Sequence, residues 1–188
     1  MALFDGTARA VLIVTLLSGT CSAAAQLGKP LTIEARTLTH TRDGQVAGCG
    51  LRFTGGEARS PVSSWFDVSL NVFRRGIAIA QSIAYDIRRS ELEGDTVPAI
   101  APVESTWLRP GEGIARRGEN SERTASLIYT LVPDDAVEVF EAVAKGEPVT
   151  VAIKRWTEPS ETIYTGPASM DDQSRRDMSA CLAELLQD

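Results

Sequence analysis

The stretch QVAGCGLRFTGGE, Gln45 to Glu57, places a cysteine between two glycines within an alternating segment. Its period of two puts Ala47, Cys49, Leu51 and Phe53 on one face, as in a half-buried strand. The Asp-Gly pair just before it is a strong hairpin signal. We therefore predict that Cys49 points into the core from the second strand of a hairpin. The glycines that flank it lie on the opposite face, which they leave thin enough for a neighbouring loop or ring.

Cys181 is the predicted partner of Cys49. It belongs to the apolar stripe of the last predicted helix, which consists of Met178, Cys181, Leu182 and Leu185. The third cysteine, Cys21, lies in a segment that we expect to be removed. Two thiols that remain in an exported protein usually pair, so we predict a disulfide that closes a loop of about 130 residues.

Residues 1–25 have the features of a secretory signal peptide. Arg9 gives a short positive flank, and the apolar run Ala10–Gly19 is too short to span a bilayer. Three alanines, Ala23–Ala25, supply the small residues that a signal peptidase needs. The arginine is single, which favours the Sec route over the twin-arginine route. A lipoprotein acylated on Cys21 is the alternative, although the residues before that cysteine fit its pattern poorly.

The remaining chain, Gln26–Asp188, has the length of one domain with a single core. The formal net charge is −6, and an acidic protein is a poor candidate for binding nucleic acid. The sequence has no polybasic tether and, after the signal peptide, no apolar run of membrane-spanning length. These features predict a periplasmic or secreted bacterial protein without a transmembrane segment in its mature form.

The element pattern predicts an α+β domain: an antiparallel sheet of about six to eight strands arranged as hairpins, with two helices and the C-terminal helix packed on the sheet. The last helix is expected to be capped by Ser169, with Asp172 completing a capping box. The predicted strands are Leu31–Thr39, Gln45–Glu57, a hairpin over Ser64–Ile87 that turns at Gly76, Glu122–Val132, Val149–Trp156 and Thr162–Gly166, and the other helix is Pro133–Glu147.

Residues 91–122 are predicted to form a long loop, because prolines and glycines interrupt them and only Val103–Leu108 resembles a strand. A long connection of this kind is usually functional or mobile. It carries Trp107, Arg116 and Arg117, and aromatic residues beside arginines are typical of interfaces.

We therefore name Trp107, Arg116 and Arg117, together with Trp65 on an outward position, as candidate interaction residues. Their partner would be an acidic protein or an anionic glycan of the cell envelope. Two plainer interpretations remain open. The arginines are solvating charges at loop tips, or the loop folds over the outer sheet face and Trp107 covers it.

No catalytic, metal or cofactor site is predicted. His40 is the single histidine, and a Ser-His-Asp hydrolase would need it as base, with Asp43 or another acid to orient it. The sequence lacks the GxSxG and SxxK patterns, the spacings of zinc sites and the acidic loops that bind calcium. The alternative function is a small secreted hydrolase that uses His40 or a pair of carboxylates.

The segment from Val143 to the C-terminus resembles the tail of the invasion-associated locus B family of exported bacterial proteins. The shared features are the helix end AKGE, an alternating strand and a final region that carries a cysteine. They cover less than a third of the chain and imply no residue role. The sequence as a whole predicts an exported, disulfide-stabilised domain that acts by binding or as an envelope or secretion accessory protein.

We expect the mature chain to begin near Gln26. Intact-mass measurement on material recovered from an exporting bacterium should show the loss of residues 1–25, because signal peptidase cleaves after small residues. A mass that includes a diacylglyceryl group on Cys21 would instead identify a lipoprotein.

Overall fold

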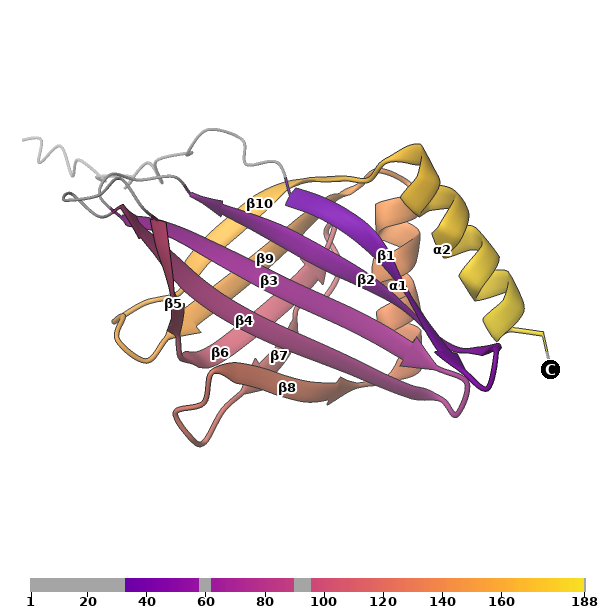
Figure 1. Ribbon diagram of the computed structural model, residues 1–188, viewed down its shortest axis with the longest axis horizontal. Coiled ribbons are helices and arrows are strands. Elements are labelled where there is room, and N and C mark those ends of the chain that lie inside the picture. The colour runs from indigo at the N-terminus through magenta and orange to yellow at the C-terminus, as the bar shows by residue number, and fades with distance from the viewer. Residues whose placement is uncertain (1–32, 58–61, 90–95, 188) are drawn as a thin grey trace, which may run out of the picture.

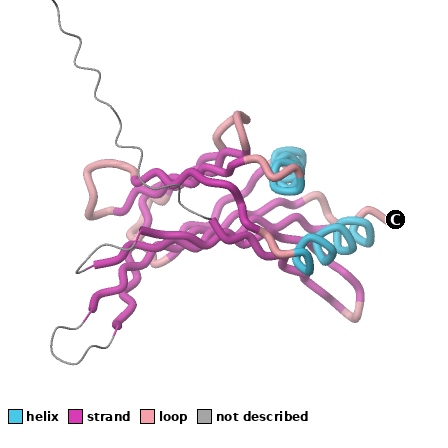
Figure 2. Tube along the Cα trace, turned by 90° about the horizontal axis from the view of Figure 1, so that it is seen from above, coloured by secondary structure: helices cyan, strands magenta, loops and turns pink. Residues whose placement is uncertain are grey.

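The computed structural model describes residues 33–57, 62–89 and 96–187, so the predicted signal peptide lies outside the described residues. The elements are β1 (Ile33–Arg42), β2 (Gln45–Glu57), β3 (Val62–Phe73), β4 (Ile77–Arg89), β5 (Thr96–Ala101), β6 (Val103–Pro110), β7 (Arg116–Glu119), β8 (Ser126–Leu131), α1 (Pro133–Ala144), β9 (Pro148–Arg155), β10 (Thr162–Ser169) and α2 (Asp172–Leu185). The strands form one sheet that curls into a half-barrel, and both helices lie near the same end of it (Figures 1 and 2).

The strand order is β5-β4-β3-β2-β1-β10-β9-β6-β7, and β8 pairs with the part of β4 that β5 leaves free. The prediction of a largely β fold with two helices is confirmed. The sheet is not purely antiparallel, however, and among the described residues it has ten strands rather than six to eight. β1 runs parallel to β10 through the pairs Ile33↔Ala168 and Glu34↔Ser169. Hydrophobic alternation identifies a strand but not the direction of its neighbour, so the sequence alone did not reveal this pairing.

Both predicted hairpins are present. β1 and β2 are joined at Asp43 and Gly44, whose φ angles of 54° and 78° are the two positive values that a type I′ turn requires. The turn between β3 and β4 has Gly76 at φ 68°, as its sequence predicts. These turns fix the register that turns Cys49, Leu51 and Phe53 into the core.

The predicted long loop over residues 91–122 is wrong, because β5, β6 and β7 lie within it. Two prolines of this segment lie at positions where a strand tolerates proline. Pro98 lies in β5, at one edge of the sheet, and Pro110 is the last residue of β6. Proline removes a ladder donor, which an edge strand or a strand end tolerates. The prediction of a strand over Val103–Leu108 is confirmed by β6.

The first helix, α1, fills the interior of the half-barrel near one end. It begins at Pro133, carries two aspartates in its first turn, and is followed by Gly146 at φ 72°. Its apolar face packs against β3, β4, β6 and β9. That face consists of Ala136, Val139, Phe140, Ala142 and Val143, all of which are buried.

The second helix, α2, is capped by Asp171 rather than by Ser169. The Ser174 amide N–H donates to Asp171 Oδ1 at 2.6 Å, and this hydrogen bond lowers the pKa of Asp171 below its usual value. Ser169 is the last residue of β10 and pairs with Glu34 of β1. Because Ser169 is paired within the sheet, β10 continues through the position where the sequence predicted a helix cap.

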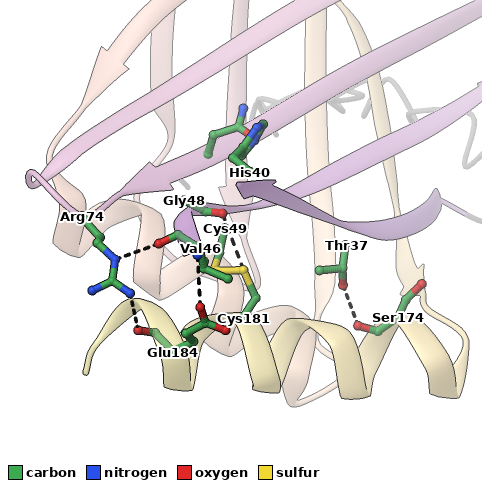
Figure 3. The surroundings of a disulfide bond; sticks show 10 residues. Thr37, His40, Val46, Gly48, Cys49, Arg74, Ser174, Cys181 and Glu184 are labelled. Atoms are coloured by element: carbon green, nitrogen blue, oxygen red, sulfur yellow. Dashed lines mark hydrogen bonds between the residues drawn. A yellow bond between two sulfur atoms is a disulfide. The ribbon is translucent and has the colours of Figure 1, made fainter. Parts of the chain in front are cut away.

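The predicted disulfide is present between Cys49 and Cys181, whose Cα atoms are 5.8 Å apart (Figure 3). Their exposed fractions are 0% and 4%, so both sulfurs are buried between β2 and α2. The prediction that α2 packs on this face of the sheet is confirmed. Closing a loop over a separation of 132 residues stabilises the fold by about 4–5 kcal/mol on the chain-entropy estimate.

The opposite face of β2 is thin, as the glycines beside Cys49 predict. A Cβ atom at Gly48 would lie 2.5 Å from Cδ1 of Phe73, and one at Gly50 would lie 2.2 Å from Oδ1 of Asn71. The side chains of β3 thus occupy the space that side chains on β2 would fill.

Hydrogen bonds supplement the disulfide along α2. The Val46 N–H donates to Glu184 Oε1 at 3.0 Å, and the Thr37 hydroxyl donates to the Ser174 carbonyl at 2.5 Å (Figure 3). Arg74, in the β3–β4 turn, donates from Nη2 to the Glu184 carbonyl at 3.0 Å, from Nη1 to the carbonyl of residue 187 at 3.0 Å, and from Nε to the Val46 carbonyl at 2.7 Å. Since the last turn of α2 has no basic residue, Arg74 supplies the cation at its carbonyl end.

Arg74→Ala is expected to lower the free energy of unfolding by about 1–2 kcal/mol and to speed amide exchange most in the last turn of α2, because that turn loses its cation. Arg75→Ala is the matched control, since no hydrogen bond or ion pair of Arg75 occurs within the described residues. Hydrogen exchange followed by mass spectrometry measures both variants in the oxidised protein. Equal protection of α2 in the two variants would contradict the role of Arg74.

Candidate functional site

Among the described residues, the core contains one charged side chain, Arg155, at the end of β9. Its exposed fraction is 1%, and it is the largest fully buried side chain of the described residues. It continues the inward-facing series Val149, Val151 and Ile153 of the same strand. A guanidinium at such a position carries a large desolvation cost unless other charges compensate it.

Two carboxylates compensate the charge of Arg155. Nη1 donates to Glu158 Oε1 at 3.0 Å, and Nη2 lies 3.9 Å from Asp86 Oδ1. Burial by itself lowers the pKa of Arg155, but the attraction of Glu158, Tyr164 and Asp86 outweighs burial and the pKa is raised. The group therefore keeps its charge. Nε and Nη2 have no hydrogen-bond acceptor among the described residues.

A cavity of about 100 Å³ adjoins this guanidinium. The strand ends that form it are those of β2, β3, β9 and β10, which Figure 1 shows at the end of the half-barrel away from the helices. It is lined by Glu57, Ser64, Arg155, Glu158, Thr162 and Tyr164. We call this the Arg155 cavity.

Tyr164 contributes a second polar group to this cavity. Its ring packs against Phe66 with centroids 4.8 Å apart, and its exposed fraction is 4%. Its hydroxyl interacts with the Arg155 guanidinium but makes no hydrogen bond of good geometry within the described residues. Burial raises the pKa of Tyr164, an effect that the nearby Arg155 reduces. The hydroxyl therefore stays protonated at neutral pH and is available as a donor.

Two of the three hydroxyl groups that line the cavity, those of Ser64 and Thr162, are oriented by neighbouring carboxylates. The Ser64 hydroxyl donates to Asp86 Oδ1 at 2.9 Å, and the Thr162 hydroxyl lies 3.4 Å from Glu158 Oε2. Because these hydrogens are directed at carboxylates, the oxygen lone pairs of Ser64 and Thr162 remain as acceptors. The cavity thus combines unpaired donors on one group of side chains with acceptors on another.

Two of the predicted interaction residues, Trp107 and Arg117, meet at Glu161. Trp107 Nε1 donates to Glu161 Oε2 at 2.8 Å, and Arg117 Nη2 donates to Glu161 Oε1 at 3.1 Å. β9 lies between β6 and β10, and Glu161 immediately precedes β10, so the indole crosses β9 at Ala152, which is fully buried. Trp107 therefore covers the outer face of its own sheet. One interpretation of the sequence is that Trp107 covers the outer sheet face from a loop. Trp107 does lie over that face, but it belongs to strand β6.

Arg116 does not belong to this surface. Its side chain is only 10% exposed and lies 2.9 Å from Asp135, with a second ion pair to Glu138, both at the start of α1. Its expected place among solvating loop charges is wrong, because alternation along β7 turns it inward while Arg117 turns outward. Trp65 lies on β3 in the other half of the sheet, where its ring contacts Gly56.

His40 lies on the outer face of β1, away from the Arg155 cavity. Its Nε2 is 2.7 Å from Asn71 Oδ1, and its ring centroid is 5.2 Å from that of Phe73. No cluster of three or more His, Cys, Asp or Glu side chains within the described ranges is placed to hold a metal ion. In the same ranges, no helix has the length and apolar character needed to cross a membrane.

Comparisons with protein-family models, with curated proteins and with solved structures find no match to this chain. The resemblance of its C-terminal region to the invasion-associated locus B family rests on the features quoted above and carries no functional assignment. The site is therefore interpreted from its own residues.

The Arg155 cavity was not predicted from the sequence, although one signal was present. In VTVAIKRW the alternation places Arg155 on the same face as Val149, Val151 and Ile153, and a charge on a core face is unusual enough to mark a site. The other lining residues come from β2, β3, β10 and the connection between β9 and β10, and they have no common spacing. Only the folded sheet brings them together.

Replacing Arg116 by alanine is expected to lower the free energy of unfolding by about 1–3 kcal/mol, because Asp135 and Glu138 are left together without their cation. The same change at the neighbouring Arg117, which is half-exposed, should alter stability by less than about 0.5 kcal/mol. Urea denaturation of the oxidised protein measures both. Equal losses of unfolding free energy in the two variants would show that the inward and the outward arginine contribute equally to stability.

Proposed function

We propose that this protein is an exported, disulfide-stabilised binding domain of a bacterial envelope, in the periplasm or secreted, and that it binds a small polar molecule in the Arg155 cavity. The observation that carries the proposal is the buried guanidinium of Arg155, which lies beside a polar cavity and has two nitrogens without a hydrogen-bond acceptor among the described residues. Buried polar groups are rarely left unsatisfied, and exceptions occur where a ligand or water completes them.

The disulfide supports the part of the proposal that concerns location. A bond between Cys49 and Cys181 persists in oxidising compartments and is rare in the reducing cytosol. The residues 1–25 have the composition of a Sec signal peptide, which is consistent with such a compartment. A role as an envelope or secretion accessory protein is compatible with the same export.

The outer surface formed by Trp107, Arg117 and Glu161 supports a further contact with an envelope protein or an anionic glycan. Arg117 is about half exposed and shares its Glu161 partner with the indole. Glu161 neutralises part of the arginine charge, so this surface is a weaker candidate than the Arg155 cavity.

A hydrolase remains the alternative function, and one observation favours it. Asp86 and Glu158 both approach Arg155, so a pair of carboxylates flanks the guanidinium, with Glu158 lining the cavity and Asp86 behind Ser64. His40 is not part of that group, since its polar neighbour is Asn71 on the outer face of the sheet. An enzyme of this kind would use the carboxylates as acid and base, with the guanidinium orienting the substrate.

The test measures the melting temperature of the dialysed, exported protein with and without the low-molecular-weight fraction of a bacterial envelope extract. A ligand that binds only the folded state should raise the melting temperature of the wild type. Arg155→Met should abolish this rise, whereas Arg109→Met, which removes an exposed arginine of β6, should retain it. The shift on addition is compared within each variant, so a change in basal stability does not affect the result.

An unchanged melting temperature in the wild type would contradict binding of a small molecule from the envelope. An equal rise in the Arg155→Met variant would place the ligand elsewhere. Chemical conversion of a component of the extract, followed by mass spectrometry and lost in Glu158→Gln or His40→Ala, would establish the hydrolase instead.

A further inference from the structure

The charges around the Arg155 cavity restrict the chemistry of its ligand. Arg155 is the one cation among the lining residues, whereas Glu57 and Glu158 are anions, and Asp86 lies just behind Ser64. A simple anion would meet the guanidinium but also the carboxylates. A simple cation would meet the carboxylates but also the buried guanidinium. Neither is a good electrostatic complement to the whole cavity.

The hydrogen-bonding groups of the cavity are also of two kinds, donors and acceptors. The donors without acceptors are Nε and Nη2 of Arg155 and the hydroxyl of Tyr164. The acceptors are the carboxylate of Glu158 and the hydroxyl oxygens of Ser64 and Thr162, whose hydrogens point to Asp86 and Glu158. A carboxylate fits the donors, and an ammonium group fits the acceptors.

From this division we infer that the Arg155 cavity binds a small zwitterion of the α-amino-acid type, with its carboxylate on Arg155 and Tyr164 and its ammonium group on Glu158, Ser64 and Thr162. The inference rests on the proposed binding function and names the class of ligand for that cavity. An α-amino acid carries its two charges on adjacent carbons, which matches donors and acceptors that line one small space.

The size of the cavity limits the ligand further. A volume of about 100 Å³ is small for a ligand site. Only a compact molecule such as glycine, or the charged end of a larger one, fits there without movement of the strands. With so few atoms, the dissociation constant is expected to be on the order of millimolar.

The test titrates the oxidised wild-type protein with glycine, with acetate and with methylammonium at constant ionic strength, followed by two-dimensional NMR. Glycine carries both charges, and each of the others carries one. Saturable shifts with glycine, and binding at least about tenfold weaker with acetate and methylammonium, are expected because each single-charge probe leaves one half of the cavity unsatisfied.

Tyr164→Phe should weaken glycine binding about ten- to a hundredfold, since it removes a hydrogen bond to a charged group. The fold should tolerate this change, because the hydroxyl makes no hydrogen bond of good geometry within the described residues and the ring that packs on Phe66 is kept. Tyr129→Phe is the matched control: the Tyr129 hydroxyl is also buried and unpartnered, but Tyr129 lies on β8 and does not line the cavity. Its glycine affinity should equal that of the wild type.

Glu158→Gln separates a binding role from a structural one. Glycine should bind more weakly because the ammonium group loses a carboxylate, whereas acetate should bind more tightly because Arg155 loses a competitor. A general loss of structure would weaken both probes together, and that result would overturn the inference.

Three further outcomes would overturn the inference at different points. Acetate binding as tightly as glycine in the wild type would overturn the zwitterion while the cavity remained a binding site. Absence of saturable shifts with all three probes would contradict both the inference and this cavity as the binding site of the proposed function. Equal weakening in Tyr164→Phe and Tyr129→Phe would show that the effect is not local, and would also overturn it.

Discussion

The curled sheet is held together across one narrow seam, the parallel pairing of β1 with β10. This pairing consists of Ile33↔Ala168 and Glu34↔Ser169, whereas the antiparallel neighbours on either side pair over much longer stretches. The chain leaves β10 directly into α2, and α2 crosses to the other side of the seam, where the Cys49–Cys181 disulfide bonds it to β2. The disulfide therefore ties the two parts of the sheet to each other, in addition to restricting the unfolded chain.

The two ends of the half-barrel differ in chemistry. Near one end, α1 and α2 bury apolar side chains and the disulfide. At the other end no described helix fills the interior, and Arg155 takes the core position. A buried charge of this kind adds little net stability even when it is paired, because desolvation offsets its attraction to Glu158 and Asp86. A polar ligand explains the presence of this buried charge better than packing does. The proposed function is therefore centred on Arg155.

Two adjacent arginines illustrate how strongly position in a strand decides role. Arg116 and Arg117 have the same chemistry, yet the first links β7 to α1 through Asp135 and the second faces outward beside Trp107. A strand turns successive side chains to opposite faces, so neighbours in sequence enter different environments. Arg74 and Arg75 differ in a similar way within a turn: both are exposed, but Arg74 donates to the carbonyl end of α2, whereas Arg75 makes no hydrogen bond or ion pair within the described residues.

The sequence by itself determined the elements whose signals are local. Alternation identified the core face of β2, the Asp43–Gly44 pair identified its hairpin, and helical spacing turned Cys181 inward, so the disulfide followed from the residues alone. Tertiary structure decided the rest. Pro98 fits a strand because β5 is an edge, and Pro110 fits because it ends β6. The parallel seam and the Arg155 cavity join residues from distant strands. Periodicity reports which face of a strand is buried, but not which strand lies beside it, and a site built from four strand ends depends on that second fact.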